Sequence, residues 1–289
     1  MHIRIYKIAG IVLSALLLLA SCGGTGSGKK KIKIGYANWL EGIAMSNLAK
    51  VVLEEYGYDV ELQNADLAPI FVSVSGKNTD VFLDTWLPIT MKDYLSQYGD
   101  SIEFLGEMYG EARVGLVVPR YVTIDSISEL AANKERFSAE IVGIDAGAGI
   151  MKTTDKAMSA YGLDGYTLMT SSSSTMLASL KKAMDKGKWI VITGWTPHWM
   201  FDRFDLKFLN DPKKVYGDLE GIHAVAWKGF READPFAAGF LGNMKLTTEE
   251  LGSFMTAMKD ARMDEEEIAR KWRNEHRQLV DSWIPESKK

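Results

Sequence analysis

Three of the eight tryptophans stand where an open α/β sheet would bind a ligand. Each follows a short apolar segment that we expect to be a strand, and glycine or proline lies close by in the sequence. They are Trp39 after 32–37, Trp86 after 81–84 and Trp195 after 189–193. Because ligands bind at the carboxyl ends of the strands in such sheets, the three indoles are candidates for one site. The alternative is that they only cap the fold.

Three indole faces around one space favour a weakly hydrated cation whose charge is spread over methyl groups, which is a quaternary ammonium group. Each face contributes about 0.5–2 kcal/mol, depending on desolvation. Three faces therefore give at most about 6 kcal/mol, less than the roughly 8 kcal/mol of a micromolar complex. A second subsite must hold the other end of the ligand.

A small-residue turn supplies a candidate for that second subsite. Segment 141–144 is strand-like and leads into Asp145-Ala146-Gly147-Ala148-Gly149-Ile150, after which a helix begins. Free backbone N–H groups and the positive end of the helix dipole would favour an anion there. A plain tight turn is the alternative.

The elements that must position these residues alternate between strand and helix, so the predicted fold class is α/β. The pattern begins, is interrupted by a second α/β unit, and resumes at 222–227 before a helical end. We therefore expect two lobes with the ligand cleft between them, joined by crossing segments near 113–119 and 222–227. The first lobe would comprise 31–115 plus 224–289, and the second 116–223. A single large doubly wound sheet is the alternative.

Composition excludes some partners. Of 289 residues, 34 are Lys or Arg and 38 are Asp or Glu, so the net charge is −4 and nothing draws the surface toward phosphates. We therefore expect no nucleic-acid partner.

The N-terminus indicates export. A basic start and the apolar run 8–20 predict a signal peptide over 1–21, since the run is too short for a comfortable membrane span. Leu19-Ala20-Ser21-Cys22 resembles the bacterial lipobox, in which the cysteine carries lipid. Cys22 is the only cysteine, and 22–30 is typical of a flexible tether. A plain signal peptide with a chance cysteine is the alternative.

Four motifs resemble those of the glycine betaine and proline betaine binding proteins of ABC importers, over about residues 31–229. They are Gly35-Tyr36-Ala37-Asn38-Trp39, Asp84-Thr85-Trp86-Leu87-Pro88, the segment 142–151, and Thr193-Gly194-Trp195-Thr196-Pro197-His198-Trp199-Met200. The resemblance implies a two-lobed periplasmic-binding-protein fold, type II-like. It also implies that Trp39, Trp86 and Trp195 enclose an ammonium head and that the amides of Gly149 and Ile150 hold a carboxylate.

One position departs from the family pattern. Five residues after the tryptophan of Trp-Leu-Pro the family commonly has a histidine that helps to bind the carboxylate, and this chain has Met91. His198 and Trp199 stand beside the cage in their motif, and we expect them to support Trp195 rather than touch the ligand.

No motif predicts catalysis, a metal or a cofactor. The sequence therefore predicts a solute-binding lipoprotein rather than an enzyme, lipid-anchored at the outer, periplasmic face of the bacterial cytoplasmic membrane. Its expected ligand is glycine betaine, proline betaine, carnitine or choline, and its expected partner is an ABC permease with ATPase subunits. A secreted lipoprotein enzyme acting on choline-type metabolites is the alternative.

Overall fold

The computed structural model describes residues 29–260 and 263–286 of the chain. Residues from Lys31 onward form one compact unit, which is described here by itself. The predicted signal peptide, the lipidated Cys22 and most of the tether lie outside the described residues. Within the described ranges, no helix combines the length and apolar character that crossing a membrane requires.

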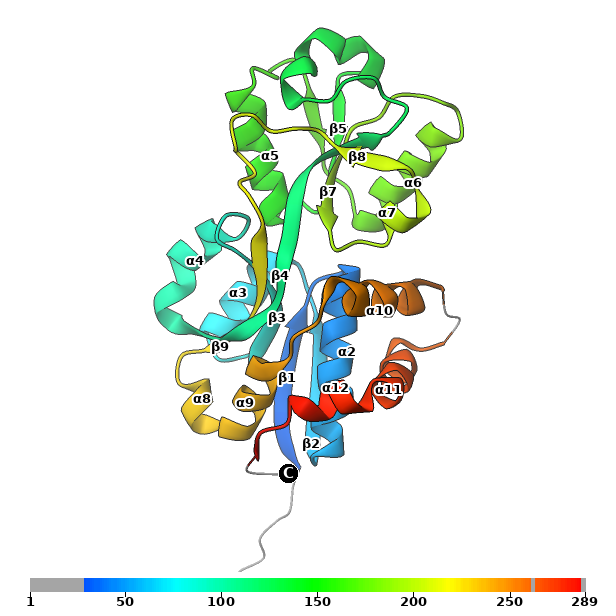
Figure 1. Ribbon diagram of the computed structural model, residues 1–289. Coiled ribbons are helices and arrows are strands. Elements are labelled where there is room, and N and C mark those ends of the chain that lie inside the picture. The colour runs from blue at the N-terminus through cyan, green and yellow to red at the C-terminus, as the bar shows by residue number, and fades with distance from the viewer. Residues whose placement is uncertain (1–28, 261–262, 287–289) are drawn as a thin grey trace, which may run out of the picture. The chain divides into compact units, whose positions relative to one another are not determined.

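A mixed sheet forms the centre of the first lobe (Figure 1). The spatial order of its strands is β2-β1-β3-β9-β4, with β1 parallel to β3 and β9 antiparallel to both β3 and β4. These strands are β1 (Lys30–Tyr36), β2 (Tyr58–Asn64), β3 (Val81–Leu87), β4 (Ile102–Pro119) and β9 (Glu220–Trp227). Every residue of β3 is buried. The sequence of β3 is therefore nearly continuous in apolar residues, as expected for a strand covered on both faces.

The long strand β4 continues into the second lobe, where it changes partners. Its residues 102–112 pair with β9, whereas 113–117 pair with β7 and 117–119 with β8. The second lobe adds β5 (Glu140–Val142), β6 (Thr167–Met169), β7 (Ile192–Thr196) and β8 (Leu206–Phe208), in the order β4-β7-β5-β6. The chain returns to the first lobe between β8 and β9. One strand and one returning segment thus connect two α/β lobes.

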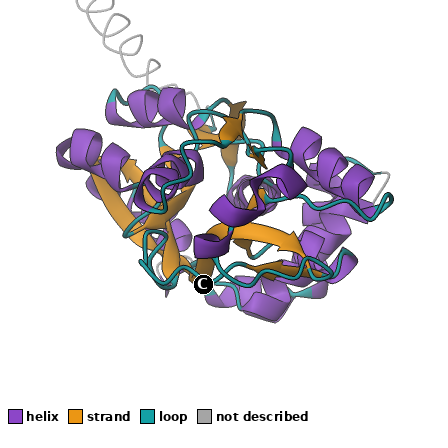
Figure 2. Cartoon of the chain, turned by 90° about the horizontal axis from the view of Figure 1, so that it is seen from above, coloured by secondary structure: helices purple, strands orange, loops and turns teal. Residues whose placement is uncertain are grey.

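Helices cover the strands of both lobes (Figure 2). Those of the second lobe are α5 (Gly149–Ala160), α6 (Ser173–Met184) and α7 (Met200–Arg203), with short 3-10 turns at Ile127–Glu129 and Ala131–Phe137. Those of the first lobe are α2 (Leu40–Glu55), α3 (Leu67–Ser75), α4 (Lys92–Tyr98) with a 3-10 turn at Gly99–Ser101, α8 (Phe230–Ala233), α9 (Pro235–Asn243), α10 (Thr248–Asp260), α11 (Glu265–Glu275) and α12 (Arg277–Ser282).

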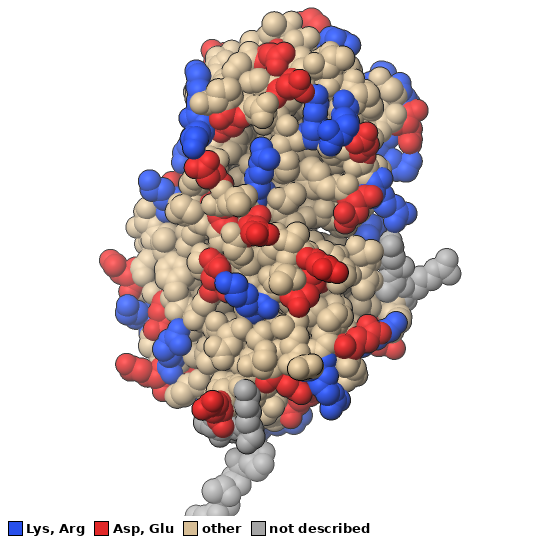
Figure 3. All heavy atoms as spheres, viewed as in Figure 1, with Lys and Arg blue, Asp and Glu red and all other residues tan. Residues whose placement is uncertain are grey.

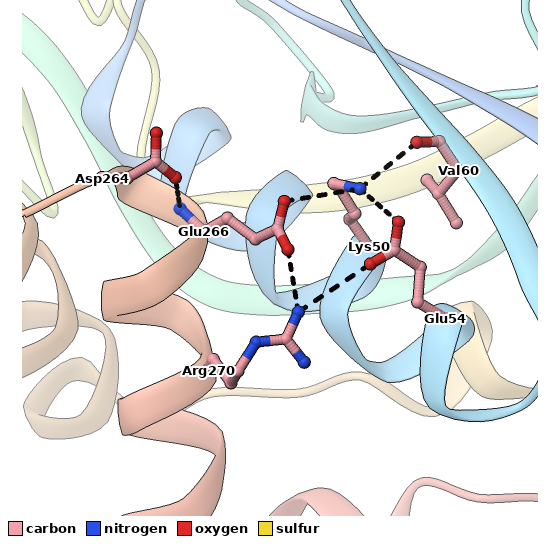
Figure 4. Close-up of polar contacts among 6 residues, drawn as sticks. All are labelled: Lys50, Glu54, Val60, Asp264, Glu266 and Arg270. Carbon is pink, nitrogen blue, oxygen red and sulfur yellow. Dashed lines mark hydrogen bonds and ion pairs between the residues drawn. The ribbon is translucent and has the colours of Figure 1, made fainter.

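A charged network joins α2, the helix that begins at the cleft, to α11, the last helix but one (Figure 4). Lys50 of α2 pairs with Glu54 on its own helix and, at 3.4 Å, with Glu266 of α11. Arg270 closes the network by contacting Glu266 at 2.8 Å and Glu54 at 3.9 Å. Because the Lys50 side chain is only 17% exposed, this network is screened less than a surface ion pair. The network therefore joins the C-terminal part of the chain to the second half of α2.

The predicted α/β alternation matches most observed elements. The first half of β4, helix α3 and strand β8 were not predicted. The lobe boundaries at 115/116 and 223/224 stay a prediction. The strand pairing changes partner a few residues earlier, between Ala112 and Arg113, and β9 pairs with β3 from Gly221 onward.

Candidate functional site

Trp39, Trp86 and Trp195 line one cavity between the lobes, and together they are called the tryptophan cage below. Trp39 is the N-cap residue of α2 and Trp86 lies in β3, both in the first lobe, whereas Trp195 lies in β7 of the second. Their exposed fractions are 6%, 3% and 4%, so the indole faces are removed from bulk water. Gly149, Ile150 and Met91 line the same cavity. The structure thus brings the five predicted binding residues and Met91, at the position of the family histidine, to one cavity.

The cavity is small, about 30 Å³. That volume suits a water molecule or two and not a trimethylammonium group. The residues that line it must therefore separate to admit a ligand, and because they come from both lobes, lobe movement supplies the room.

Two of the three tryptophans lie inside their strands, whereas the sequence predicted that all three follow their strands. Trp86 is inside β3, paired with Ile222 of β9, and Trp195 is inside β7, paired with Val114 of β4. The expectation was wrong here because the antiparallel partners extend both ladders beyond the apolar segments on which the prediction rested. Each of the two tryptophans is the next-to-last residue of its strand, so both remain at the edge of the sheet that faces the cleft.

The first turn of α5 also lines the cavity. Gly149 and Ile150 open this helix, where backbone N–H groups have no acceptor within the helix and the dipole is positive. A Cβ atom added at Gly149 would lie 2.2 Å from the carbonyl oxygen of Thr90 in the first lobe. Glycine is therefore needed for the lobes to approach as closely as they do, and the geometry suits an anionic group.

Met91 offers no hydrogen-bond donor to a ligand. It is fully buried at the N-terminus of α4, and its sulfur accepts from the Trp86 backbone N–H at 3.4 Å. The adjacent Thr90 is held by Glu220 of β9, which accepts from its backbone N–H at 2.9 Å and from its hydroxyl. The turn that carries Met91 is thus tied to the strand that returns from the second lobe.

Two buried carboxylates stand beside the cage, and one of them lines the cavity. Glu41, in the first turn of α2, is a lining residue, and Asp84 of β3 accepts from the Trp86 indole N–H at 2.7 Å. Each is 1% exposed. Burial raises the pKa of Asp84 to about 7, and burial together with the neighbouring Asp84 charge raises the pKa of Glu41 well above its usual range. The cage therefore combines aromatic faces with two acids whose ionisation burial opposes.

Glu41 was not predicted as a site residue. An acidic residue in the first turn of a helix is usually explained by the helix dipole, which conceals any other role. The signal available in the sequence was its spacing, two residues after a cage tryptophan on the same turn.

His198 packs against Trp195, and its supporting role stays a prediction. Its ring packs edge-to-face on the Trp195 indole with centroids 4.9 Å apart, and its Nδ1 accepts the Met200 backbone N–H at 3.0 Å. Burial lowers the pKa of His198 to about 3, so the ring is neutral. Trp199 faces instead a larger groove of about 510 Å³ that shares Trp39 with the cage.

The site offers aromatic faces, buried acids and the free amides of a helix terminus. In the described ranges, no group of three or more His, Cys, Asp or Glu side chains is placed to hold a metal ion. Acidic and basic side chains are interspersed over the face seen in Figure 3. A buried aromatic and acidic cavity between two lobes, also lined by the first turn of a helix, defines a substrate-binding protein.

Residues 30–275 match the family described as the substrate binding domain of ABC-type glycine betaine transport systems, and the chain belongs to that family. Members of this family are transport binding proteins and not enzymes, and the substrate-binding proteins of ABC importers are extracytoplasmic. This confirms the predicted family and the predicted two-lobed fold.

Known relatives agree with this assignment. Over 151 residues, 52% of this chain and 50% of the relative, it is 46% identical to the glycine betaine/carnitine transport binding protein GbuC of Listeria monocytogenes serotype 1/2a (strain 10403S). That match spans about half of the relative's length. The crystal structure of lactococcal OpuAC, closed and complexed with glycine betaine, has 35% identity and a TM-score of 0.83 over 89% of this chain and 100% of that one. An ABC-transporter choline binding protein in complex with choline has 25% identity and a TM-score of 0.83 over 88% and 91%.

Proposed function

We propose that the protein is an extracytoplasmic lipoprotein that captures glycine betaine or a related quaternary ammonium compound in the tryptophan cage and delivers it to an ABC permease, for osmoprotectant uptake. The observation that carries this proposal is the convergence of three buried tryptophans, drawn from both lobes, on one cavity that also contains the first turn of α5.

The cage suits the ammonium end of such a ligand. A methylated ammonium is weakly hydrated, so moving it between buried indole faces costs little desolvation, and each face contributes up to about 2 kcal/mol. The buried acids Glu41 and Asp84, whose pKa values burial raises, can ionise against the positive charge of the ligand on the same side. A neutral ligand of the same shape gains neither term.

The first turn of α5 suits the other end. The N–H groups of Gly149 and Ile150 can hold a carboxylate, as in glycine betaine, proline betaine or carnitine. Met91 adds no hydrogen-bond donor that would select for a carboxylate. Choline, which has no carboxylate, therefore loses little at this position. The names of the relatives support this range, since one is named for glycine betaine and carnitine, and two were solved with glycine betaine and with choline.

Anchoring and delivery complete the proposal. Lipid attachment at the outer face of the cytoplasmic membrane is supported by the segment Leu19-Ala20-Ser21-Cys22 and by the predicted flexible tether over 22–30. A ligand that contacts both lobes favours the closed form over the open one, which gives a permease a means to tell loaded protein from empty protein.

A thermal-shift screen of the purified protein against glycine betaine, proline betaine, carnitine and choline tests the function, because a ligand bound only by the folded state raises Tm. Calorimetry then compares the wild type with Trp39→Ala, Trp86→Ala and Trp195→Ala. We expect each variant to lose about 1–2 kcal/mol, or more if closure also fails.

Trp227→Phe is the control for this series, since Trp227 donates to Asp80 away from the cavity. We expect it to bind as the wild type does. The proposal fails if none of the four compounds raises Tm, or if ligand binding is insensitive to all three cage substitutions.

A further inference from the structure

Each indole N–H of the tryptophan cage lies beside a carboxyl group. The Trp86 N–H donates to Asp84, two residues earlier on the same strand, at 2.7 Å. The Trp195 N–H lies close enough to the Glu41 carboxyl to oppose the effect of burial on its pKa. Trp195 Nε1 and Glu41 Oε2 are nevertheless buried without a hydrogen-bond partner among the described residues. The two groups line one cavity from opposite lobes, and no hydrogen bond joins them.

Trp39 repeats the arrangement with Asp145. The Trp39 indole N–H is also buried without a partner in the part of the chain that the structure describes. It lies near the carboxyl group of Asp145, whose pKa burial raises and the Trp39 N–H lowers. Trp39 and Asp145 line the same groove at the mouth of the cleft.

These two pairs, Glu41 with Trp195 and Asp145 with Trp39, are called the crossing pairs, because each spans the two lobes. In one pair the first lobe supplies the acid, and in the other it supplies the tryptophan. Glu41 belongs to α2 of the first lobe and Trp195 to β7 of the second. Trp39 precedes α2, and Asp145 follows β5 of the second lobe. The Asp84–Trp86 pair stays within one strand and does not report lobe position.

We propose that Glu41 and Asp145 are positioning residues that receive the indole N–H groups of Trp195 and Trp39 when the lobes close on a ligand, so that cage assembly and lobe closure are one event. The inference rests on the proposed function and deepens it. A carboxylate at the N–H edge fixes the rotation of an indole, and the ring face stays turned toward the ammonium group.

The buried atoms without partners give this step its driving force. Buried polar groups are normally hydrogen-bonded, and one left without a partner destabilises the state in which it occurs. A rotation of the two indoles within the closed cleft, without a closer approach of the lobes, satisfies Trp195 Nε1, Glu41 Oε2 and Trp39 Nε1 together. The open form satisfies them with water, so a closed form in which the indoles have not yet turned is the least favourable of the three. Closure of this kind is two-state, and the ligand supplies the bias.

A double-mutant cycle tests the proposal with glycine betaine as the probe. Trp195→Phe keeps an aromatic face and removes the N–H, and Glu41→Ala removes the acceptor. We expect each to raise Kd about 10- to 100-fold, the loss of one hydrogen bond to a charged group. The double variant should bind about as weakly as the worse single one. Asp145→Ala with Trp39→Phe should behave in the same way.

Controls separate positioning from folding. Glu41→Gln keeps an acceptor oxygen but no charge, so it should bind glycine betaine more tightly than Glu41→Ala and less tightly than the wild type. Because both substitutions remove a buried acid, Tm in the absence of ligand should stay the same or rise, whereas a residue needed only for the fold would lower it. Asp80→Ala with Trp227→Phe breaks the same kind of pair, 3.0 Å long, inside the first lobe and should leave Kd unchanged.

The outcomes also separate this inference from the proposed function. If wild type binds none of the quaternary ammonium compounds, the proposed function fails first. If wild type binds and the effects of Glu41→Ala and Trp195→Phe multiply independently, or if Glu41→Gln binds as weakly as Glu41→Ala, the crossing pairs do not position the cage and the inference is overturned.

Discussion

Replacing Asp84 by asparagine should stabilise the unliganded protein at alkaline pH and change little at acidic pH. Asp84 is fully buried in β3 and its pKa is raised to about 7 by burial, from an ordinary value of 3.8. Asparagine has nearly the same shape and keeps an oxygen that accepts the Trp86 indole N–H. The substitution therefore removes the charge and preserves the contact.

The sign and size follow from linkage. Since the folded-state pKa lies above that of the unfolded chain, the folded state binds more protons, and stability is lost as the pH rises from about 4 to about 7. A difference of roughly 3 pH units, at 1.36 kcal/mol each, corresponds to at most about 4 kcal/mol. Asp84→Asn should recover up to that amount at pH 8 and almost none at pH 4. Glu41 should also ionise more easily in the variant, because the Asp84 charge helps to raise its pKa.

Urea unfolding of wild type and variant at pH 4.5 and pH 8, without ligand, measures the effect as a difference in free energy of unfolding. Asp80→Asn is the matched control, because its carboxylate also accepts an indole N–H, from Trp227, but lies only half-buried. We expect no gain at pH 8 for the control. An equal gain for Asp84→Asn at both pH values, or a loss at pH 8, would show that Asp84 is not a destabilising buried charge.

Three further predictions concern the ligand and the membrane. Met91→His should increase the preference for glycine betaine over choline in competition binding, more so below about pH 6.5 where histidine is protonated, and an unchanged ratio would place Met91 outside the binding contacts. Gly149→Ala should weaken binding of every ligand in calorimetry by about 1–3 kcal/mol, because its Cβ would lie 2.2 Å from the Thr90 carbonyl oxygen and hold the lobes apart. Unchanged affinity would mean that the backbone around Gly149 shifts at little cost. Cys22→Ser should release the protein from the membrane fraction or leave its signal uncleaved, and a processed, membrane-bound variant would refute lipid anchoring.

The architecture could be predicted because its elements carry local signals. Strand β3 is rich in apolar residues, the two isoleucines of β1 alternate with lysines, and α2 shows helical spacing before it ends at Tyr56-Gly57. The first half of β4 gave no such signal. Its burial alternates irregularly, and its register against β9 shifts at several points, so no period of two survives in the sequence.

The aromatic part of the site was equally accessible, because tryptophan beside glycine or proline at a strand end is unusual in a hydrophobic core. The partners of those tryptophans were not accessible. Glu41 and Asp145 approach their tryptophans across the cleft, and although Glu41 stands two residues after Trp39, no pattern within one lobe reports an approach made by closing two. Such contacts depend on lobe geometry rather than on local sequence.

The buried acids explain why the cage is not simply hydrophobic. An apolar pocket lined by the same three indoles would be easier to fold, since neither Glu41 nor Asp84 is paired with a cation among the described ion pairs. A quaternary ammonium group supplies that missing positive charge without donating a hydrogen bond. Binding should therefore favour the ionised acids and lower their pKa, and protons should be released as the ligand enters at neutral pH. The instability of the unliganded site and its preference for a cation have the same physical origin.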